Sequence, residues 1–514
     1  MKKKKANIFG IIHVGSTYMT LQIVSYTDID TITIIENASR QVTFGEEVFQ
    51  THRLSFASID EICETLKGFC RLLKEYDVQD YHVYATTAIR EAENRENIID
   101  QVQLRTGMNL DVIDLPKEIY YKYFALYRQM MKNQITFDDE AILFMDITAG
   151  GVGVTIWKSG ELLFQQNVHI GALRIWESFD RNQRDEEEFP VAIREYIHGV
   201  LHPLWRMVQT FKVRYFVLSG MEARRMGDIM NCREHAAATW IEPKYFQEFL
   251  GTLGTLSATR LMHRYGLSES DANLLIPSML LYYEVLQMVD VEKIIIMNTS
   301  FIEGVVMYHG AEAEKNPYLA MQREENLNLA RNIGKKYLYN EEHAKNMERF
   351  AQIFYAALQP AHGLPERAGY LLRMAAILHE IGKFVNLRSH SQYSYELIMG
   401  TDIFGLTEGE KAVVATLAYF HYKGVPTEDN EKMKLLVPRQ RRLVRKLVPI
   451  FRLCRALNQG HDGKIKEISA ALKKNRLEVR YTADMDISLE RWTFQKESEY
   501  FQEVYGVLPV LVKG

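Results

Sequence analysis

Residues 145–155 read M-D-I-T-A-G-G-V-G-V-T, and this stretch decides the fold class. An apolar run over residues 141–145 ends at Asp146, glycines follow, and a second β-branched run begins. The pattern predicts two strands joined by a tight turn at Gly150-Gly151, because glycine lets the backbone approach a neighbouring group closely. Such a turn can offer backbone N–H groups to phosphate oxygens. An ordinary glycine hairpin is the alternative.

The chain opens with a similar pattern. Residues 8–14 and 19–25 read as strands around the turn Gly15-Ser16-Thr17. In both halves, more β-branched runs alternate with helical patterns, and one of these runs ends at Ser219-Gly220. Two halves that open alike predict a duplicated α/β unit, with a ligand cleft at the strand ends.

The character of the sequence changes near residue 316. Residues 320–460 have an almost entirely helical period, and the last sixty residues return to α/β. We therefore expect a helical domain and a small C-terminal domain after the duplicated part.

The composition limits the classes of function and partner that we expect. A chain of 514 residues is too long for one core, and a net charge of −4 gives no reason to expect nucleic-acid binding. The basic run 434–446 is either a solvated helix face or a track for a polyanion. Four cysteines show no paired spacing, and no apolar run approaches the roughly 20 residues that span a bilayer. We expect a cytoplasmic protein that contacts neither nucleic acid nor membranes.

Three charged residues stand where phosphate chemistry needs them. Arg90 lies in A-T-T-A-I-R-E-A-E-N (85–94), at the start of a predicted helix, where its guanidinium can bind phosphate. Glu118 falls in the first turn of another predicted helix. Asp146 ends a strand beside a glycine turn, where a carboxylate can hold hydrated Mg²⁺ near phosphates. The alternatives are a solvated arginine and a glutamate that pairs with the helix dipole.

The helical half contains A-I-L-H-E-I-G-K (376–383), with further histidines around it. His379 and Glu380 are adjacent, and His343, His390 and His421 come at intervals. An adjacent histidine and carboxylate can share a binuclear metal. Core or surface histidines of a helical bundle are the alternative.

The ordered set of segments resembles the Ppx/GppA family of exopolyphosphatases and guanosine pentaphosphate phosphohydrolases over nearly the whole chain. Five or more segments carry the resemblance: residues 13–18 (family D-I-G-S-N-S), 85–94 (A-T-x-A-x-R-x-A-x-N, intact), 113–119 (I-S-G-x-E-E-A), 146–153 (D-I-G-G-G-S-T-E), 171–174, 218–221 and 298–304 (D-G-x-x-x-E-G). In the helical half, L-H-E-I-G, 390–398 and 418–421 also have family counterparts.

The resemblance implies a fold. Residues 1–130 and 131–312 are expected to form duplicated actin-like domains of the hexokinase, ribonuclease-H-like type. An all-α HD-like domain over 313–465 and a small α/β domain over 466–514 are expected to follow. The family also implies a homodimer.

The resemblance also implies roles. Glu118 matches the glutamate that activates the attacking water, Asp146 is the second catalytic residue, and Mg²⁺ is expected near Asp146. The residues expected to bind phosphate are Gly15, Ser16, Thr17, Arg90, Gly150, Gly151, Ser219 and Gly220.

Departures from the family pattern cluster at the positions that carry the family's chemistry. His13 replaces an aspartate, Gly153 a glutamate and Asn298 an aspartate; the other departures there are Tyr18, Lys117, Val152 and Met221. In the helical domain, Arg455 and Asn458 replace aspartates, and Ser391 and Tyr393 replace histidines. A positive charge beside a cation disfavours binding, so His343, His379, Glu380, His390 and His421 are expected to form a degenerate cluster without metal.

Two functional hypotheses follow. In the first, the chain is an enzyme that releases terminal phosphate from inorganic polyphosphate or from guanosine pentaphosphate. In the second, it is a catalytically weakened relative that senses polyphosphate or guanosine tetra- or pentaphosphate, or acts through protein partners. The retained Glu118 and Asp146 favour the enzyme, whereas His13, Gly153 and Asn298 favour the sensor.

Overall fold

The computed structural model divides the chain into two compact units, Met1–Arg323 and Glu324–Gly514. It describes residues 6–514 except 134, 136–138, 185, 187, 231–237, 254–257, 298 and 423. Asn298 and one of the four cysteines, Cys232, thus lie outside the described residues.

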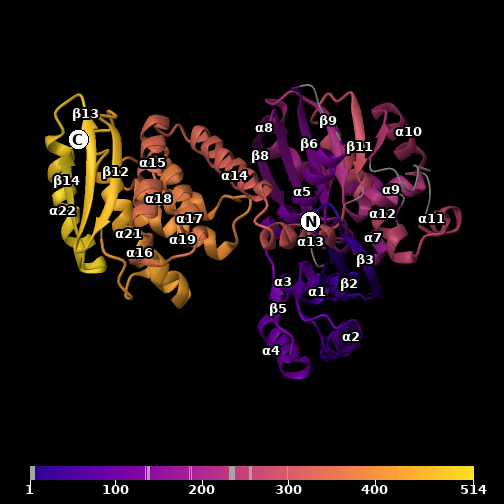
Figure 1. Cartoon of the computed structure of the whole chain (residues 1–514). Coiled ribbons are helices and arrows are strands. Elements are labelled where there is room, and N and C mark those ends of the chain that lie inside the picture. Colours follow the sequence, from indigo (N-terminus) through magenta and orange to yellow (C-terminus); the bar gives the residue numbers. More distant parts are fainter. Residues whose placement is uncertain are drawn as a thin grey trace, which may run out of the picture. The chain divides into compact units, whose positions relative to one another are not determined.

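The first sheet of the N-terminal unit has five strands in the order β3-β2-β1-β4-β5. It belongs to the indigo and purple part of the chain in Figure 1, where β2, β3 and β5 are labelled. Their bounds are β1 Asn7–Val14, β2 Tyr18–Tyr26, β3 Thr33–Gln41, β4 Tyr81–Ala85 and β5 Leu110–Val112. The first three strands pair antiparallel, whereas β4 and β5 run parallel to β1. The predicted hairpin around Gly15 is confirmed, with Gly15 N–H bonded to Tyr18 O at 2.9 Å.

The second sheet has six strands in the order β10-β11-β9-β6-β7-β8. Their bounds are β6 Ala141–Ile147, β7 Val152–Lys158, β8 Glu161–Val168, β9 Val213–Ser219, β10 Ala238–Ile241 and β11 Lys293–Met297. Strands β8-β7-β6-β9-β11 repeat the order and the pairing directions of β3-β2-β1-β4-β5, and β10 adds an antiparallel edge on β11. The predicted duplication is therefore confirmed.

Helices cover both sheets of this unit. We call β1–β5 with helices α1–α5 the first lobe, and β6–β11 with helices α6–α12 the second lobe. The bounds are α1 Phe44–Thr51, α2 Phe56–Glu75, α3 Thr87–Glu91, α4 Arg95–Thr106, α5 Leu115–Lys132, α6 Ala172–Glu177, α7 Arg181–Arg184, α8 Phe189–Gln209, α9 Met221–Ile229, α10 Pro243–Leu253, α11 Ala258–Tyr265 and α12 Glu269–Leu286. Each lobe has its own apolar core.

Helix α13 (Phe301–Ala313) returns to the first lobe, although it follows the last strand of the second. It packs on α5 and on β1. A Cβ at Gly304 would lie 2.1 Å from Tyr121 O, so glycine is what allows the two helices to approach so closely. This contact accounts for the glycine of the segment 298–304.

The C-terminal unit is a helical domain followed by a small sheet. Its helices are α14 Pro317–Lys336 (which begins in the first unit), α15 Glu341–Ala357, α16 Gln359–His362, α17 Glu366–Leu378, η1 Ile381–Phe384, α18 His390–Met399, α19 Glu408–Phe420, α20 Glu431–Lys434 and α21 Pro438–Ala456. The sheet β12-β13-β14 (Ile465–Lys473, Arg476–Ala483, Leu508–Lys513) is accompanied by α22 (Ser488–Tyr505). One continuous apolar core joins the helices and the sheet.

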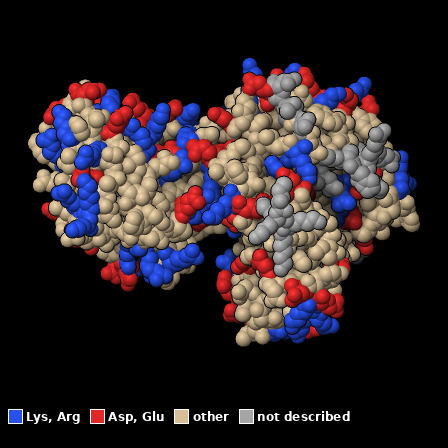
Figure 2. Space-filling model, viewed as in Figure 1, with Lys and Arg blue, Asp and Glu red and all other residues tan. Residues whose placement is uncertain are grey.

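The charges on the surface and the lengths of the apolar helices bear on the expected partners. Figure 2 shows Lys and Arg side chains interspersed with Asp and Glu over the face in view. No described helix combines the length and the apolar character that crossing a membrane requires. The expected homodimer, cytoplasmic location and domain boundaries stay predictions.

Candidate functional site

The turn of the first hairpin buries a hydroxyl that no described group satisfies. Ser16 is 5 % exposed, and its Oγ makes no hydrogen bond with the described residues. Its carbonyl oxygen accepts from Gly45 N at 2.9 Å, and Thr17 O accepts from Val42 N at 2.9 Å, so the turn is held against the start of α1. A buried hydroxyl without a partner costs free energy, which a ligand oxygen here would recover.

Helix α3 starts directly after β4 and brings a threonine pair to this turn. Thr86 Oγ1 lies 2.9 Å from His13 Nε2, across 73 residues of sequence. Arg90 donates to Thr87 Oγ1 at 3.0 Å and to Ile113 O at 2.9 Å, which fixes its guanidinium. His13 thus fills the place of the family aspartate with a ring that is bonded to the next strand end. No sequence pattern indicates that pairing, because the two residues are 73 positions apart.

Glu118 lies in the first turn of α5, as predicted. Asp114 caps this helix by accepting from Lys117 N at 3.0 Å, and so sets where the first turn begins. Glu118 is 4 % exposed, and its Oε2 accepts from Arg90 at 3.1 Å. The structure therefore brings together two residues that the sequence predicted separately.

Asp146 is the penultimate residue of β6 and forms a buried ion pair that was not predicted from the sequence. Lys122 Nζ donates to Asp146 Oδ2 at 2.7 Å, and it lies 4.0 Å from Glu118 Oε1. Ser219 Oγ donates to Asp146 Oδ1 at 3.2 Å. Gly220 follows with φ of 93°, and a Cβ there would lie 2.8 Å from Asp146 Oδ1. Glycine is therefore required at this position by both space and backbone conformation.

The charges of this cluster influence one another. Burial raises the pKa of Asp146 to about 6, against the opposing effect of Lys122. Burial also acts to lower the pKa of Lys122, but Asp146 and Glu118 outweigh it and raise that pKa. Burial lowers the pKa of His13 to about 4, with Glu118 opposing and Lys122 assisting. At pH 7 the cluster therefore holds a charged Lys122–Asp146 pair beside a neutral His13.

The turn of the second hairpin is closed by its own threonine. Gly151 N donates to Thr148 Oγ1 at 2.9 Å, and Thr148 N donates to Gly151 O at 2.8 Å. The Gly151 N–H that we expected to face phosphate is thus bonded within the loop. Gly150 lies against the first lobe, since a Cβ there would meet Thr87 Cγ2 at 2.4 Å.

An ion pair joins the two lobes beside this turn. Arg174 of α6 pairs with Glu91 of α3, and its Nε donates to Gly150 O at 3.0 Å. Its guanidinium also lies over the Phe49 ring, 4.9 Å from the centroid. The lobes are thus closed around Ser16, Glu118 and Asp146, none of which exceeds 5 % exposure. These three side chains are therefore shielded from solvent in this structure.

The donor set around Asp146 does not fit a resident Mg²⁺ ion. Mg²⁺ needs carboxylates that are free to bind it, but an ammonium already compensates Asp146 and a guanidinium already binds Glu118. Position 153 offers no second carboxylate, and a Cβ there would meet Ile119 Cγ2 at 2.7 Å. Among the described residues, the groups of three close metal-ligand atoms lie in the C-terminal unit, at His343, His379, Glu380, His390 and His421. The side chains around Asp146 therefore do not support the prediction of a Mg²⁺ ion there.

Comparison with known proteins bears on the fold and the family. Residues 22–311 match the Ppx/GppA phosphatase family, and residues 327–502 match domain III of that family. A guanosine-5'-triphosphate,3'-diphosphate pyrophosphatase of Aeromonas hydrophila is 21 % identical over 430 residues, covering 83 % of each chain. Its counterpart from Aeromonas salmonicida is 21 % identical over 466 residues, covering 89 % of this chain and 90 % of that protein.

Solved structures share the fold over about 60 % of this chain. An exopolyphosphatase from Cytophaga hutchinsonii aligns with a TM-score of 0.53 and 21 % identity, covering 60 % of this chain and 98 % of its own. A Ppx/GppA family member from Aquifex aeolicus aligns with a TM-score of 0.50 and 18 % identity, covering 61 % and 99 %. The duplicated sheets agree with the actin-like architecture predicted from the sequence, and the match of residues 327–502 to domain III agrees with the predicted helical domain.

Proposed function

The chain belongs to the Ppx/GppA phosphatase family, and from this premise we propose that it hydrolyses the terminal phosphoanhydride of inorganic polyphosphate or of guanosine pentaphosphate. The observation that carries the proposal is the position of Glu118. It is a buried carboxylate, bonded to a fixed arginine and coupled electrostatically to both His13 and Asp146. These partners come from three other elements: β1 and α3 of the first lobe and β6 of the second.

In this mechanism Glu118 is the general base. It accepts a proton from a water molecule, whose oxygen attacks the terminal phosphorus as the bond to the bridging oxygen breaks. Arg90 holds the carboxylate in place through the 3.1 Å bond. The terminal phosphate leaves as inorganic phosphate, and the shortened chain carries the bridging oxygen.

Positive charge in this mechanism comes from side chains. Arg90 and the buried Lys122 lie within hydrogen-bond or ion-pair distance of Glu118, and so next to the reacting phosphate. Charges placed in advance in a water-poor site stabilise developing negative charge more strongly than charges in water do. Ser16, with its unpaired hydroxyl, is the donor we place on a phosphate oxygen.

The test is phosphate release. Purified full-length protein is given long-chain polyphosphate or guanosine pentaphosphate, and Glu118→Gln is compared with the wild type. A general base contributes roughly 10²–10⁴-fold, so release should fall by about that factor. Glu96→Gln, at an exposed ion pair with Arg95, is the control and should keep full activity. Wild-type release no faster than that of Glu118→Gln refutes the enzyme.

A second function is favoured by one observation. Lys122 neutralises Asp146, and a glycine stands where the family has a glutamate, so the site keeps its scaffold but has fewer free carboxylates. Such a site suits binding without turnover. Saturable binding of guanosine tetraphosphate or polyphosphate, measured by calorimetry in a protein that releases no phosphate, supports this sensor function.

A further inference from the structure

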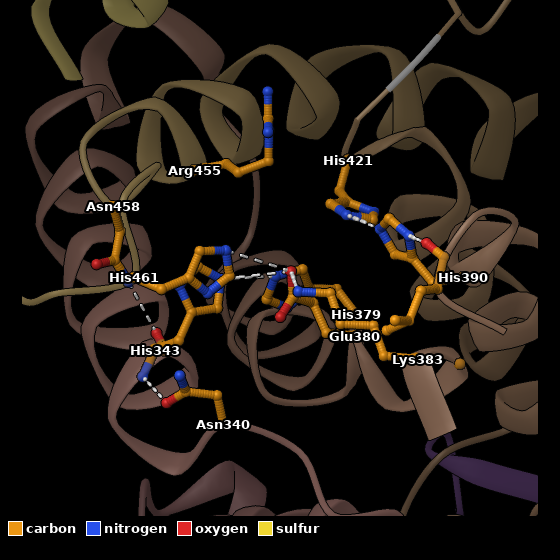
Figure 3. Close-up of polar contacts among 12 residues, drawn as sticks. Asn340, His343, His379, Glu380, Lys383, His390, His421, Arg455, Asn458 and His461 are labelled. Atoms are coloured by element: carbon orange, nitrogen blue, oxygen red, sulfur yellow. Dashed lines mark hydrogen bonds and ion pairs between the residues drawn. The ribbon is translucent and has the colours of Figure 1, made fainter. Parts of the chain in front are cut away.

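Several metal-ligand side chains meet inside the helical domain (Figure 3). They come from four helices that lie far apart in the sequence: His343 from α15, His379 and Glu380 after α17, His390 from α18, and His421 after α19. Two groups have ligand atoms within 4.8 Å of one another, namely His343, His379 and Glu380, and Glu380, His390 and His421. The phosphate chemistry proposed above uses none of these residues.

The hydrogen bonds of His390 and His421 fix where their ring protons lie. Each Nδ1 bonds to the carbonyl oxygen three residues earlier in the chain, at 3.1 Å for His390 and 2.6 Å for His421. A carbonyl only accepts, so each Nδ1 must carry the hydrogen. A neutral imidazole has one N–H, and each Nε2 therefore presents a lone pair.

Those two lone pairs face each other. His390 Nε2 and His421 Nε2 are 3.3 Å apart, so a proton or a metal ion between them would satisfy both atoms at once. In a tetrahedral zinc site with Zn–N bonds of about 2.0–2.1 Å, neighbouring ligand nitrogens are about 3.3–3.4 Å apart. Proteins commonly orient a metal-binding histidine through such a bond from its other nitrogen. The spacing and the ring orientation both match a metal site.

Burial differs across the cluster and leaves a metal ion a route of entry. His421 is 1 % exposed. Glu380 is also buried and supplies an oxygen ligand, whereas His390 is only partly buried, which opens the site to solvent on that side.

We infer that Glu380, His390 and His421 hold one divalent transition-metal ion of the zinc class. Two imidazoles and a carboxylate leave the fourth tetrahedral position for water or a ligand, as in catalytic rather than structural zinc sites.

The neighbouring pair, His343 and His379, differs because its two facing ring nitrogens can hydrogen-bond to each other. Asn458 Nδ2 donates to His343 Nδ1 at 2.8 Å, so the hydrogen of His343 lies on Nε2. That N–H faces His379 Nε2 at 3.3 Å, and His379 Nδ1 bonds to Ala376 O at 2.9 Å. This pair has a donor facing an acceptor and needs no ion.

The inference runs against the expectation from sequence, which rested on Arg455. Figure 3 shows the Arg455 side chain directed away from Glu380. Its guanidinium donates to Gln459 Oε1 at 2.7 Å and lies 3.8 Å from Glu497 Oε1, which compensates part of its charge. Lys383 donates to Glu380 Oε1 at 2.7 Å, but its side chain is about one-third exposed and can withdraw into water when a metal binds.

The test is zinc content. The full-length protein is stripped with a chelator, incubated with Zn²⁺, desalted and measured by mass spectrometry of the metal. The wild type should retain one zinc per chain, and His390→Asn and His421→Asn should retain none. His362→Asn is the matched control: His362 is a buried histidine of the same domain whose two ring nitrogens contact backbone groups at 2.9 Å. It and His343→Asn should keep the zinc.

Two further readouts separate metal loss from misfolding. Zinc should raise the thermal unfolding midpoint of the wild type and of His362→Asn but not of His390→Asn, and Co²⁺ should give the visible absorption of a tetrahedral site only in proteins that retain zinc. A wild type without zinc, or His390→Asn and His421→Asn with as much zinc as the wild type, overturns the inference. Loss of zinc in His343→Asn alone would place the ion in the other group and overturn it as well.

Discussion

Replacing Lys122 by methionine removes the ammonium from the buried pair while keeping most of the side-chain volume. The pair is 2.7 Å long, and at an effective dielectric constant of about 20 its Coulomb attraction is roughly 6 kcal/mol. Desolvation of both charges offsets much of this, but removing one partner leaves Asp146 buried and uncompensated. We therefore expect Lys122→Met to lower the free energy of unfolding by about 3–5 kcal/mol at pH 8.

The loss should shrink in acid. The pKa of Asp146 is already raised to about 6 in the folded protein, so a proton can neutralise it once Lys122 is gone. At pH 5 the penalty should be clearly smaller than at pH 8. The double variant Lys122→Met with Asp146→Asn should recover part of the loss at pH 8, because no buried charge is left alone.

The assay is urea denaturation followed by tryptophan fluorescence. Four of the five tryptophans lie in the N-terminal unit: residues 157, 176, 205 and 240. Lys132→Met, at an exposed lysine of the same helix that donates to Asp30 O at 3.1 Å, is the control and should change stability by less than about 0.5 kcal/mol. Equal, small losses for both variants at pH 8 would refute the buried-pair reasoning.

Three further predictions concern the same unit. Burial lowers the pKa of His13 from 6.5 to about 4 in the folded protein. Between pH 4 and pH 6.5 the unfolded chain therefore binds more protons than the folded protein, and the free energy of unfolding rises with pH. His13→Asn should reduce this rise, measured by urea denaturation, by up to about 1.4 kcal/mol per pH unit. Gly304→Ala should cost about 1–3 kcal/mol in the same assay, because its Cβ would lie 2.1 Å from Tyr121 O; an unchanged midpoint would contradict that contact. Glu91→Gln should loosen the lobes by freeing Arg174, seen as faster hydrogen exchange in residues 148–151, and unchanged exchange would count against the closed state.

Local chemistry made the hairpins predictable. Glycines flanked by β-branched runs set both turns, and the cap at Asp114 with Glu118 in the first turn set α5. The strand β11 was not predicted, although its run K-I-I-I-M is strongly apolar, because so short a run carries no periodicity that separates a buried strand from a helix.

The partners within the site could not be predicted in the same way. Lys122 and Asp146 are 24 residues apart on different elements, and His13 and Thr86 are 73 apart, so only the packing of the lobes brings them together. Family resemblance supplied Glu118 and Asp146 but not the lysine beside them. The same holds in the helical domain, where tertiary packing sets the direction of the Arg455 side chain.

The proposed function requires that the two hairpins and Glu118 form a site for a terminal phosphate. The most direct measurement is a crystal structure of Glu118→Gln with tripolyphosphate, since this variant should bind the anion without cutting it. We expect the terminal phosphate between the lobes, within hydrogen-bond distance of Ser16 Oγ and in contact with Arg90 or Lys122. Tripolyphosphate found only on the basic run 434–446, with Ser16 and Lys122 unchanged, would contradict it.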